Sequence, residues 1–331
     1  MKFATMPDGT LDGRLVVVSR DLTRCVSVAD VAANLADALR RWDDVEAPLR
    51  RLSDALNANA APDGEPFDPA ACAAPLPRSP QWCDGSAFLN HGNLMDSAFD
   101  RAPIAGRDVV PLMYQGASDD FLGPCADVPL PREDEGIDFE GEFGVVVGAV
   151  PMGASAAEGL AAVRLVVLLN DWSLRGLGRR EMVTGFGFFQ AKPSTAFAPV
   201  AVTPDELDDA WRHGRVQLNL HIEWNGAWFG HPHGGEMSFS FGELIAHAAH
   251  TRRLTAGTII GSGTVSNADR AAGSACIAER RAIELIDHGA SVTGFMQFGD
   301  RVRMQARRPD GTDGPFGVID QRVVDATGAA G

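Results

Sequence analysis

The chain has 331 residues, and its 29 Lys and Arg residues against 44 Asp and Glu residues give a formal net charge of −15. Hydrophobic residues make up 45% of the chain and charged residues 22%, which is typical of a folded globular protein and excludes a largely disordered one. The acidity argues against a general nucleic-acid binder, because such a protein needs basic surface to displace the counterions of the phosphates.

The cysteines and the N-terminal segment indicate a compartment. Five cysteines are an odd number, widely spaced and without a CxxC pair, which favours reduced thiols over a disulfide framework or a zinc site. The N-terminal segment lacks the apolar stretch of a signal peptide, and no run approaches the roughly 18 apolar residues that span a bilayer. The sequence therefore predicts a cytoplasmic protein with neither a membrane nor a nucleic acid as partner.

The first elements in chain order form a small α/β unit. Residues 3–6 and 15–19 are predicted strands separated by Asp-Gly turn signals. Ser27-Val-Ala-Asp30 resembles a capping box that starts a helix, and a second helix is expected to begin at Pro48. Residues 57–79 are rich in Ala and Pro, as in an extended linker. We therefore expect a small N-terminal domain with its linker over residues 1–76 and a larger domain over residues 77–331.

The larger part of the chain is dominated by β-like runs between glycines. The runs cover residues 144–150, 163–169, 216–224, 258–262 and 300–305, and shorter helical patterns cover residues 154–162, 173–183 and 240–252. The pattern shows no regular βαβ alternation and no glycine-rich phosphate-binding motif. It predicts a mixed α/β, β-rich domain rather than a Rossmann fold or a TIM barrel.

One acidic segment, residues 138–148 (DFEGEFGVVVG), is predicted to be a strand. Successive side chains of a strand alternate between its faces, so that Asp138, Glu140 and Glu142 would share one face. Glu140 and Glu142 would then lie roughly 7 Å apart. On a buried strand their charges repel unless a cation neutralises them, and Mg²⁺ or Ca²⁺ prefers such oxygen ligands. The alternative is a solvated strand face that carries acids by chance.

A second acidic residue follows a predicted buried strand. Residues 163–169 are apolar except for Arg164, and they lead directly into Asn170-Asp171-Trp-Ser-Leu-Arg175. A carboxylate at the end of a buried strand is well placed to complete a metal site. Asp171 and Arg175 are also four residues apart, so Asp171 can instead be a helix N-cap with a plain salt bridge.

Together the segments DFEGEFGVVVG and LLNDWSLRG resemble the signature of the fumarylacetoacetate hydrolase family, and the resemblance covers most of residues 80–305. It implies a β-roll or sandwich catalytic domain preceded by a small N-terminal α/β domain. It also implies a bound Mg²⁺ or Ca²⁺, with Mn²⁺ as a further candidate, on Glu140, Glu142 and Asp171. The fumarylacetoacetase branch adds an upstream aspartate, matched by Asp84, and a catalytic histidine seven residues later, matched by His91.

Four further positions match the family's motifs. Tyr114 stands in a segment similar to the family's substrate-binding tyrosine segment, and Thr264 matches the threonine of a late Ser-Gly-Thr loop. Arg175 matches an arginine four residues after the metal-binding aspartate, and Lys192 matches a lysine near the reacting carbonyl. The resemblance therefore implies that Tyr114, Arg175 and Thr264 bind the substrate. It also implies that Arg175 and Lys192 take part in catalysis.

Three departures from the fumarylacetoacetase pattern bear on the substrate and on the catalytic pair. Ser86 stands where that branch has a tyrosine, and Gly178 stands where it has a glutamine. Counted from the threonine of the Ser-Gly-Thr loop, the position of that branch's catalytic glutamate is occupied by Ala278, and the nearest carboxylate is that of Glu279. Either a one-residue shift places Glu279 beside His91, or the catalytic pair is built differently.

The resemblance predicts a metal-dependent hydrolase that cleaves a carbon–carbon bond in a β-diketone acid of the fumarylacetoacetate or acylpyruvate type. Such an enzyme belongs to the catabolism of aromatic compounds and is expected to be a homodimer. His91, assisted by Glu279, would activate the water, because the ordinary pKa of histidine suits a base that works near neutral pH. Two alternatives remain. One is a lyase that decarboxylates a 2-oxo diacid, which needs the metal but no water-activating pair, and the other is a non-catalytic binding protein.

Overall fold

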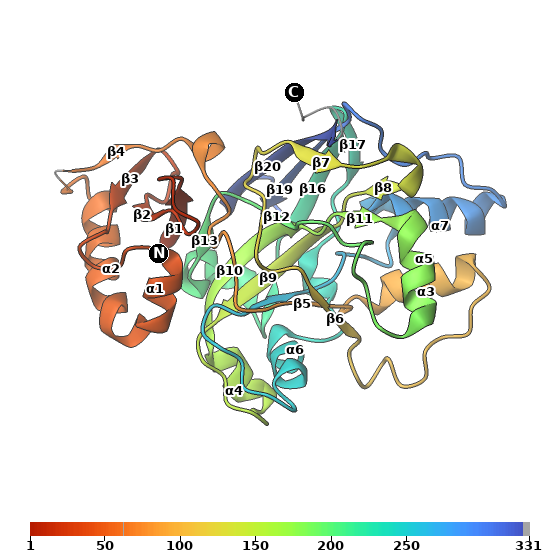
Figure 1. Ribbon diagram of the computed structural model, residues 1–331, viewed down its shortest axis with the longest axis horizontal. Coiled ribbons are helices and arrows are strands. Elements are labelled where there is room, and N and C mark those ends of the chain that lie inside the picture. The colour runs from red at the N-terminus through yellow and green to blue at the C-terminus, as the bar shows by residue number, and fades with distance from the viewer. Residues whose placement is uncertain (62, 327–331) are drawn as a thin grey trace.

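The N-terminal part is a small α/β unit whose strands lie at one end of a larger sheet (Figure 1). The computed structural model describes residues 1–61 and 63–326. Helix α2 buries Trp42, Val45, Leu49 and Leu56 along one face, the apolar stripe of an amphipathic helix. The elements of this part are β1 (Lys2–Met6), β2 (Arg14–Val18), β3 (Arg24–Ser27), α1 (Leu35–Arg40), α2 (Trp42–Asn57) and β4 (Glu65–Pro66).

The helices and the linker of this part differ from the sequence prediction. Helix α1 begins at Leu35 rather than after Ser27, because the side chain of Asn34 accepts the hydrogen bond of the Asp37 N–H and caps the helix there. Pro48 lies inside α2 instead of at its start, since the buried stripe extends to both sides of it. The expected extended linker is also packed: β4 pairs with β3, and Ala74 and Leu76 are buried.

One large mixed sheet, which has eleven strands in the described residues, runs through the molecule in the order β4-β3-β2-β1-β13-β10-β9-β18-β5-β6, with β12 beside β10. Strand β1 pairs with β13 in antiparallel fashion, so that the N-terminal strands continue the sheet of the larger part. The burial of β10 on both faces is confirmed. The remaining strands are β5 (Trp82–Gly85), β6 (Met113–Gly116), β9 (Gly141–Val147), β10 (Val163–Asn170), β12 (Ala196–Phe197), β13 (Ala201–Val202) and β18 (Ile259–Gly261).

A second, antiparallel sheet with one parallel edge strand packs against the first. Phe143 of β9 and Phe316 of β20 meet between the sheets with ring centroids 6.1 Å apart. A Cβ atom on Gly141 would lie 2.7 Å from Leu220 Cδ2, so glycine at this position lets the two sheets approach closely. The second sheet contains β17 (Ala227–Gly230), β16 (Asn219–Trp224), β19 (Arg301–Arg307), β20 (Asp313–Asp325) and β7 (Val128–Leu130), in that order.

Helices flank this sandwich in two groups (Figure 1). Helices α4 (Ala156–Ala161) and α6 (Phe241–Ala248) pack against each other, as do α3 (Leu89–Ala98) and α7 (Ile277–His288). Helix α5 (Arg175–Thr184) lies beside the second group. Two small strand pairs, β8 (Ile137–Asp138) with β11 (Ser173–Leu174) and β14 (Trp211–Arg212) with β15 (Arg215–Val216), complete the strands of the described residues.

The fold is thus mixed α/β and sheet-rich, as predicted, but several strands and helices begin or end at other residues than predicted. The run at residues 144–150 is the strand 141–147, and residues 216–224 form two strands because β15 turns back to pair with β14. The helix predicted over residues 240–252 ends at Ala248. No helix of residues 1–61 or 63–326 combines the length and the apolar character that a membrane span requires.

Candidate active site

Three carboxylates meet at one end of the large sheet. Asp84 lies near the end of β5, Glu142 near the start of β9, and Asp171 directly after β10. Because β9 runs antiparallel to β10 and β18, and β18 runs parallel to β5, these positions lie at the same end. One oxygen of each carboxylate lies within 4.8 Å of the others, and all three residues are buried. We call Asp84, Glu142 and Asp171 the acidic triad.

Glycines make room for the Asp84 carboxylate. A Cβ atom on Gly261, in the neighbouring strand, would lie 2.3 Å from Asp84 Oδ1, so a larger residue there would displace the carboxylate. The N–H of Gly263 donates to the same oxygen at 3.0 Å. The Gly-Ser-Gly sequence at residues 261–263 therefore fixes one member of the acidic triad.

The electrostatics of the acidic triad fit a hard divalent cation. Burial, followed by the charges of Asp84 and Asp171, raises the pKa of Glu142 well above its usual range, and burial together with Asp171 raises the pKa of Asp84 to about 8. No donor group of residues 1–61 or 63–326 bonds either carboxylate oxygen of Glu142, although both are buried. Three buried carboxylates grouped in this way, of which Glu142 keeps both oxygens free of donors among the described residues, are the kind of ligand set that Mg²⁺, Mn²⁺ or Ca²⁺ takes.

Glu140 lies beside the acidic triad in a cationic environment. Its Oε1 atom accepts hydrogen bonds from Lys192 Nζ at 2.6 Å and from Ser173 Oγ at 2.5 Å, and Arg175 Nη2 lies 3.1 Å from it. Thr264 donates to its other oxygen. Burial disfavours the charged form of Glu140, but Arg175 and Lys192 outweigh it and hold the pKa of this carboxyl below its usual range.

Asp171 is held by three side chains. Tyr114 donates its hydroxyl to Asp171 Oδ2 at 2.5 Å, and Lys192 Nζ lies 2.6 Å from the same oxygen. Thr195 donates to Oδ1 at 2.8 Å. Asp171 precedes β11 and does not cap α5, so the alternative of a helix N-cap paired with Arg175 is wrong. The sequence analysis did not identify the hydroxyl groups of Ser173 and Thr195 as parts of the site. Ser173 stands two residues after Asp171, and Thr195 stands three residues after Lys192.

Asp138, which the strand pattern placed on the same face as Glu140 and Glu142, lies outside the acidic triad. The predicted continuous strand breaks after Asp138, because β8 pairs with β11 whereas β9 pairs with β10. Its buried carboxylate accepts hydrogen bonds from Arg175 and from two backbone N–H groups of α7. Asp138 is therefore separate from the acidic triad.

His91 and Glu279 form a pair across two packed helices. His91 lies in the first turn of α3, shortly after the strand that holds Asp84, and Glu279 lies in the first turn of α7. The His91 Nδ1 atom is 2.8 Å from Glu279 Oε2, and the two side chains are 18% and 1% exposed. Backbone bonding of Gly141 to Ala275 joins the start of β9 to the segment before α7. The structure thus places Glu279, and not Ala278, beside the histidine.

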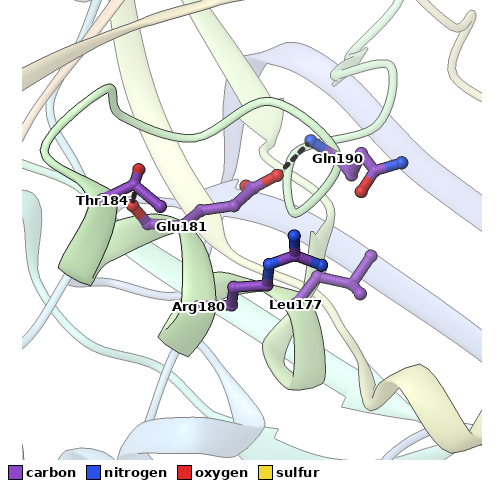
Figure 2. A pocket seen from close by; sticks show the side chains of 5 residues that line it. All are labelled: Leu177, Arg180, Glu181, Thr184 and Gln190. Carbon is purple, nitrogen blue, oxygen red and sulfur yellow. Dashed lines mark hydrogen bonds between the residues drawn. The ribbon is translucent and has the colours of Figure 1, made fainter.

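The segment that follows α5 leads directly to Lys192 and is held by one carboxylate. Glu181 accepts hydrogen bonds from the backbone N–H groups of Phe189, Gln190 and Ala191 at 2.9, 2.8 and 3.1 Å. Figure 2 shows this carboxylate reaching toward Gln190 at a cavity of about 220 Å³. The cavity is lined by Leu177, Arg180, Glu181, Thr184 and Gln190, and no member of the acidic triad lines it.

Replacing Glu181 with alanine should loosen residues 185–191. A hydrogen bond to a charged group contributes roughly 1.5–3 kcal/mol to stability. The contribution of the Glu181 bonds is smaller, because solvent near Glu181 screens its charge. We expect chymotrypsin to cleave after Phe186 or Phe189 about tenfold faster than in the parent, since tenfold corresponds to about 1.4 kcal/mol. Glu284→Ala is the matched control, because Glu284 holds residues 292 and 293 in a similar way. Equal cleavage of Glu181→Ala and the parent would refute this role.

Comparison with known proteins assigns the chain to a family. The sequence model of the fumarylacetoacetate (FAA) hydrolase C-terminal family matches residues 81–324, and that of fumarylacetoacetase N-terminal domain 2 matches residues 1–78. A curated relative, 2,4-didehydro-3-deoxy-L-rhamnonate hydrolase of Sphingomonas sp. (strain SKA58), is 31% identical over 157 residues, which are 46% of this chain and 52% of the relative. The chain thus spans about half the length of the curated relatives that it matches.

Solved structures share the fold over nearly the whole chain. Maleylpyruvate hydrolase from Sphingobium sp. SYK-6, in complex with manganese (II) ion and pyruvate, superposes with a TM-score of 0.66 at 16% identity, covering 98% of this chain and 99% of that one. Fumarylacetoacetate hydrolase from the psychrophilic Exiguobacterium antarcticum superposes with a TM-score of 0.65 at 18% identity, with the same coverage. The two structures share the fold. The family matches over residues 81–324 and 1–78 show that the chain belongs to the fumarylacetoacetate hydrolase family.

Proposed function

We propose that this chain is a metal-dependent hydrolase that cleaves a carbon–carbon bond in a β-diketone acid of the fumarylacetoacetate or acylpyruvate type. The observation that carries this proposal is the His91–Glu279 pair, because His91 lies on α3, the helix that follows the strand of Asp84 in the acidic triad. The names of the Sphingomonas and Sphingobium relatives, both hydrolases, support it. The proposed ion is Mg²⁺, Mn²⁺ or Ca²⁺, held by the acidic triad with Glu140 as the neighbouring fourth carboxylate.

A divalent ion bound there supplies a Lewis acid that polarises a substrate carbonyl and stabilises an enolate leaving group. The protein supplies the water activation. Because Nδ1 of His91 faces Glu279, Nε2 is the nitrogen left to accept the proton of a water molecule. Glu279 orients the imidazole and stabilises its charged form. The water oxygen adds to the carbonyl carbon, and the bond from that carbon to the central carbon breaks. The central carbon then receives the proton that His91 took from the water, which yields two acids.

Two cations and two hydroxyl groups are proposed to orient the substrate. Lys192 lies 2.6 Å from both Glu140 and Asp171, and its ammonium group is proposed to stabilise the oxyanion that forms on the attacked carbonyl. Arg175 is 24% exposed and is proposed to bind the substrate carboxylate. Tyr114 and Thr264, which contact Asp171 and Glu140, are proposed to border the substrate.

The surroundings of Gly178 bear on the substituent of the substrate. A Cβ atom on Gly178 would lie 3.7 Å from Phe188 Cε1 and 3.7 Å from Ala191 Cβ, so apolar groups surround the position where fumarylacetoacetase carries a glutamine. Phe188 also packs edge-on against Tyr114 at 5.3 Å. Acylpyruvates with an apolar acyl group are therefore the first substrates to test.

A substrate panel tests the proposed function. Acylpyruvates, fumarylacetoacetate, maleylpyruvate and oxaloacetate would each be incubated with the protein and Mg²⁺, Mn²⁺ or Ca²⁺. We expect loss of the diketone absorbance together with one equivalent of each product acid. Carbon dioxide release from oxaloacetate with intact diketones would overturn the hydrolase in favour of the lyase, and the absence of any turnover would favour a binding protein.

We also propose that the chain forms a homodimer. The segment between α3 and β6 exposes the apolar side chains of Ile104, Val109 and Val110, which a second copy could cover. Light scattering at micromolar protein should give close to twice the chain mass of 35.1 kDa. A mass of one chain under the same conditions would contradict the dimer.

A further inference from the structure

Asp138 has a fully buried carboxylate, and both of its oxygens accept hydrogen bonds. Oδ1 accepts a hydrogen bond from the Ile277 N–H at 2.7 Å, and Oδ2 accepts one from the Ala278 N–H at 2.9 Å. The Arg175 Nε–H donates to Oδ2 at 2.7 Å. All three donors belong to elements that carry proposed site residues, since α5 begins with Arg175 and α7 carries Glu279 in its first turn.

The α7 contacts hold the helix end that presents Glu279. The first N–H groups of a helix have no partner within the helix and need an outside acceptor. The residue before α7, Cys276, accepts the Glu279 N–H only through its sulfur, at 3.3 Å, and sulfur is a weak acceptor. Asp138 supplies a charged acceptor to the two preceding N–H groups, and a negative charge at a helix N-terminus is favourable.

The contact between Asp138 and Arg175 fixes the guanidinium group of Arg175. The guanidinium group donates through Nε to Asp138, while its Nη2 atom lies 3.1 Å from Glu140 Oε1. A planar guanidinium that is bound along one edge keeps a fixed orientation. One carboxylate thus lies between the cation proposed to bind the substrate and the helix turn that places the partner of His91.

We propose that Asp138 is a positioning residue that aligns both Arg175 and the His91–Glu279 pair, an inference that rests on the proposed function. Its two oxygens are occupied by N–H donors, so it holds no ion itself. It acts through two separate residues, and its loss should therefore have two separable kinetic effects: a lower kcat through the histidine pair and a higher KM through Arg175.

Asp138→Asn tests this role. The side-chain amide keeps the shape but places an NH₂ group against N–H donors, so some of the three hydrogen bonds must be lost. We expect kcat to fall about tenfold or more and KM to rise several-fold, with divalent-ion affinity unchanged by calorimetric titration. Asp134→Asn is the matched control, because Asp134 also pairs with an arginine, Arg132, but both side chains are 65% exposed; its kinetics should equal those of the parent.

A double-mutant cycle separates positioning from a general structural effect. In a His91→Ala background, Asp138→Asn should cause little further loss of kcat, because the pair that it aligns is gone, while the rise in KM persists. A kcat loss of the same factor in both backgrounds would overturn the proposal, and so would parental kinetics of Asp138→Asn.

Hydrogen exchange of the parent protein keeps the inference testable if Asp138→Asn does not fold. The amides of Ile277 and Ala278 should exchange as slowly as those in the middle of α7, although first-turn amides normally exchange fast. Fast exchange at both would overturn the role of Asp138. If the parent turns over none of the diketone acids, the proposed function fails, while the exchange rates still report on the hydrogen bonds of Asp138.

Discussion

Replacing Glu142 with leucine is expected to abolish divalent-ion binding and, at the same time, to stabilise the metal-free protein. The first effect follows from the position of Glu142 in the acidic triad. The second follows because its buried carboxylate receives no hydrogen bond from a donor group in the part of the chain that the structure describes, and because it lies beside two other carboxylates. Leaving a buried polar group without a partner costs roughly 1–3 kcal/mol, which the leucine side chain would avoid.

Two measurements check this prediction. Calorimetric titration with Mn²⁺ should show binding to the parent and none to the variant. Thermal unfolding in the presence of a chelator should give the variant the higher midpoint, and added Mn²⁺ should raise the midpoint of the parent alone. Glu243→Leu is the control with the opposite sign, because Glu243 completes the capping box of α6 with the N-cap Ser240. This variant should bind the ion normally and unfold at a lower temperature. A Glu142→Leu protein that binds the ion, or that is less stable without it, would refute our assignment.

Replacing His91 with alanine is expected to reduce kcat at least about 10²-fold, the usual lower scale for the loss of a general base. The reason is that His91 is the proposed acceptor of the water proton and is the imidazole that pairs with Glu279. Steady-state kinetics on the best diketone substrate would measure the loss. Ion affinity should not change, because the ligands are other residues.

His221→Ala is the matched control for this variant. His221 also pairs with a glutamate, at 3.2 Å from Glu223, but it lies on β16 of the second sheet. Its replacement should leave kcat at the parental value. If His91→Ala retains activity within a few-fold of the parent, the reaction does not depend on water activation by this pair, and the decarboxylating lyase becomes the better hypothesis.

Local patterns predicted the parts of the site that depend on single segments. The alternation of side chains along a strand placed Glu142 in a buried acidic position, and the apolar run before Asp171 identified a strand buried on both faces. The shifted spacing around Ala278 and Glu279 left two arrangements open. Only the packing of α3 against α7 decides between them, because it brings together residues that are 188 positions apart.

The structure differs from the sequence prediction where contacts with distant segments determine the local structure. Asp138 lies on a short strand separate from that of Glu142, because this strand pairs with β11, a partner that the sequence of the segment does not reveal. Asp84 joins the acidic triad through the parallel pairing of β5 with β18, whose residues follow more than 170 positions later. Pro48 remains inside a helix because the apolar stripe on both of its sides packs against the sheet. In each case tertiary contacts outweigh a local preference.

The antiparallel pairing of β1 with β13 means that the two family segments share one continuous hydrogen-bonded ladder. Strand β13 is now an interior strand, bordered by β1 on one side and by β10 on the other. Removal of the N-terminal strands would turn β13 into an open edge with unpaired N–H and C=O groups, a template for aggregation. It would also uncover Leu165 and Val167 of β10, which belong to the apolar cluster shared with the N-terminal helices. We therefore expect the N-terminal segment to stabilise the sheet that carries the acidic triad, and the larger part to aggregate when it is produced without this segment.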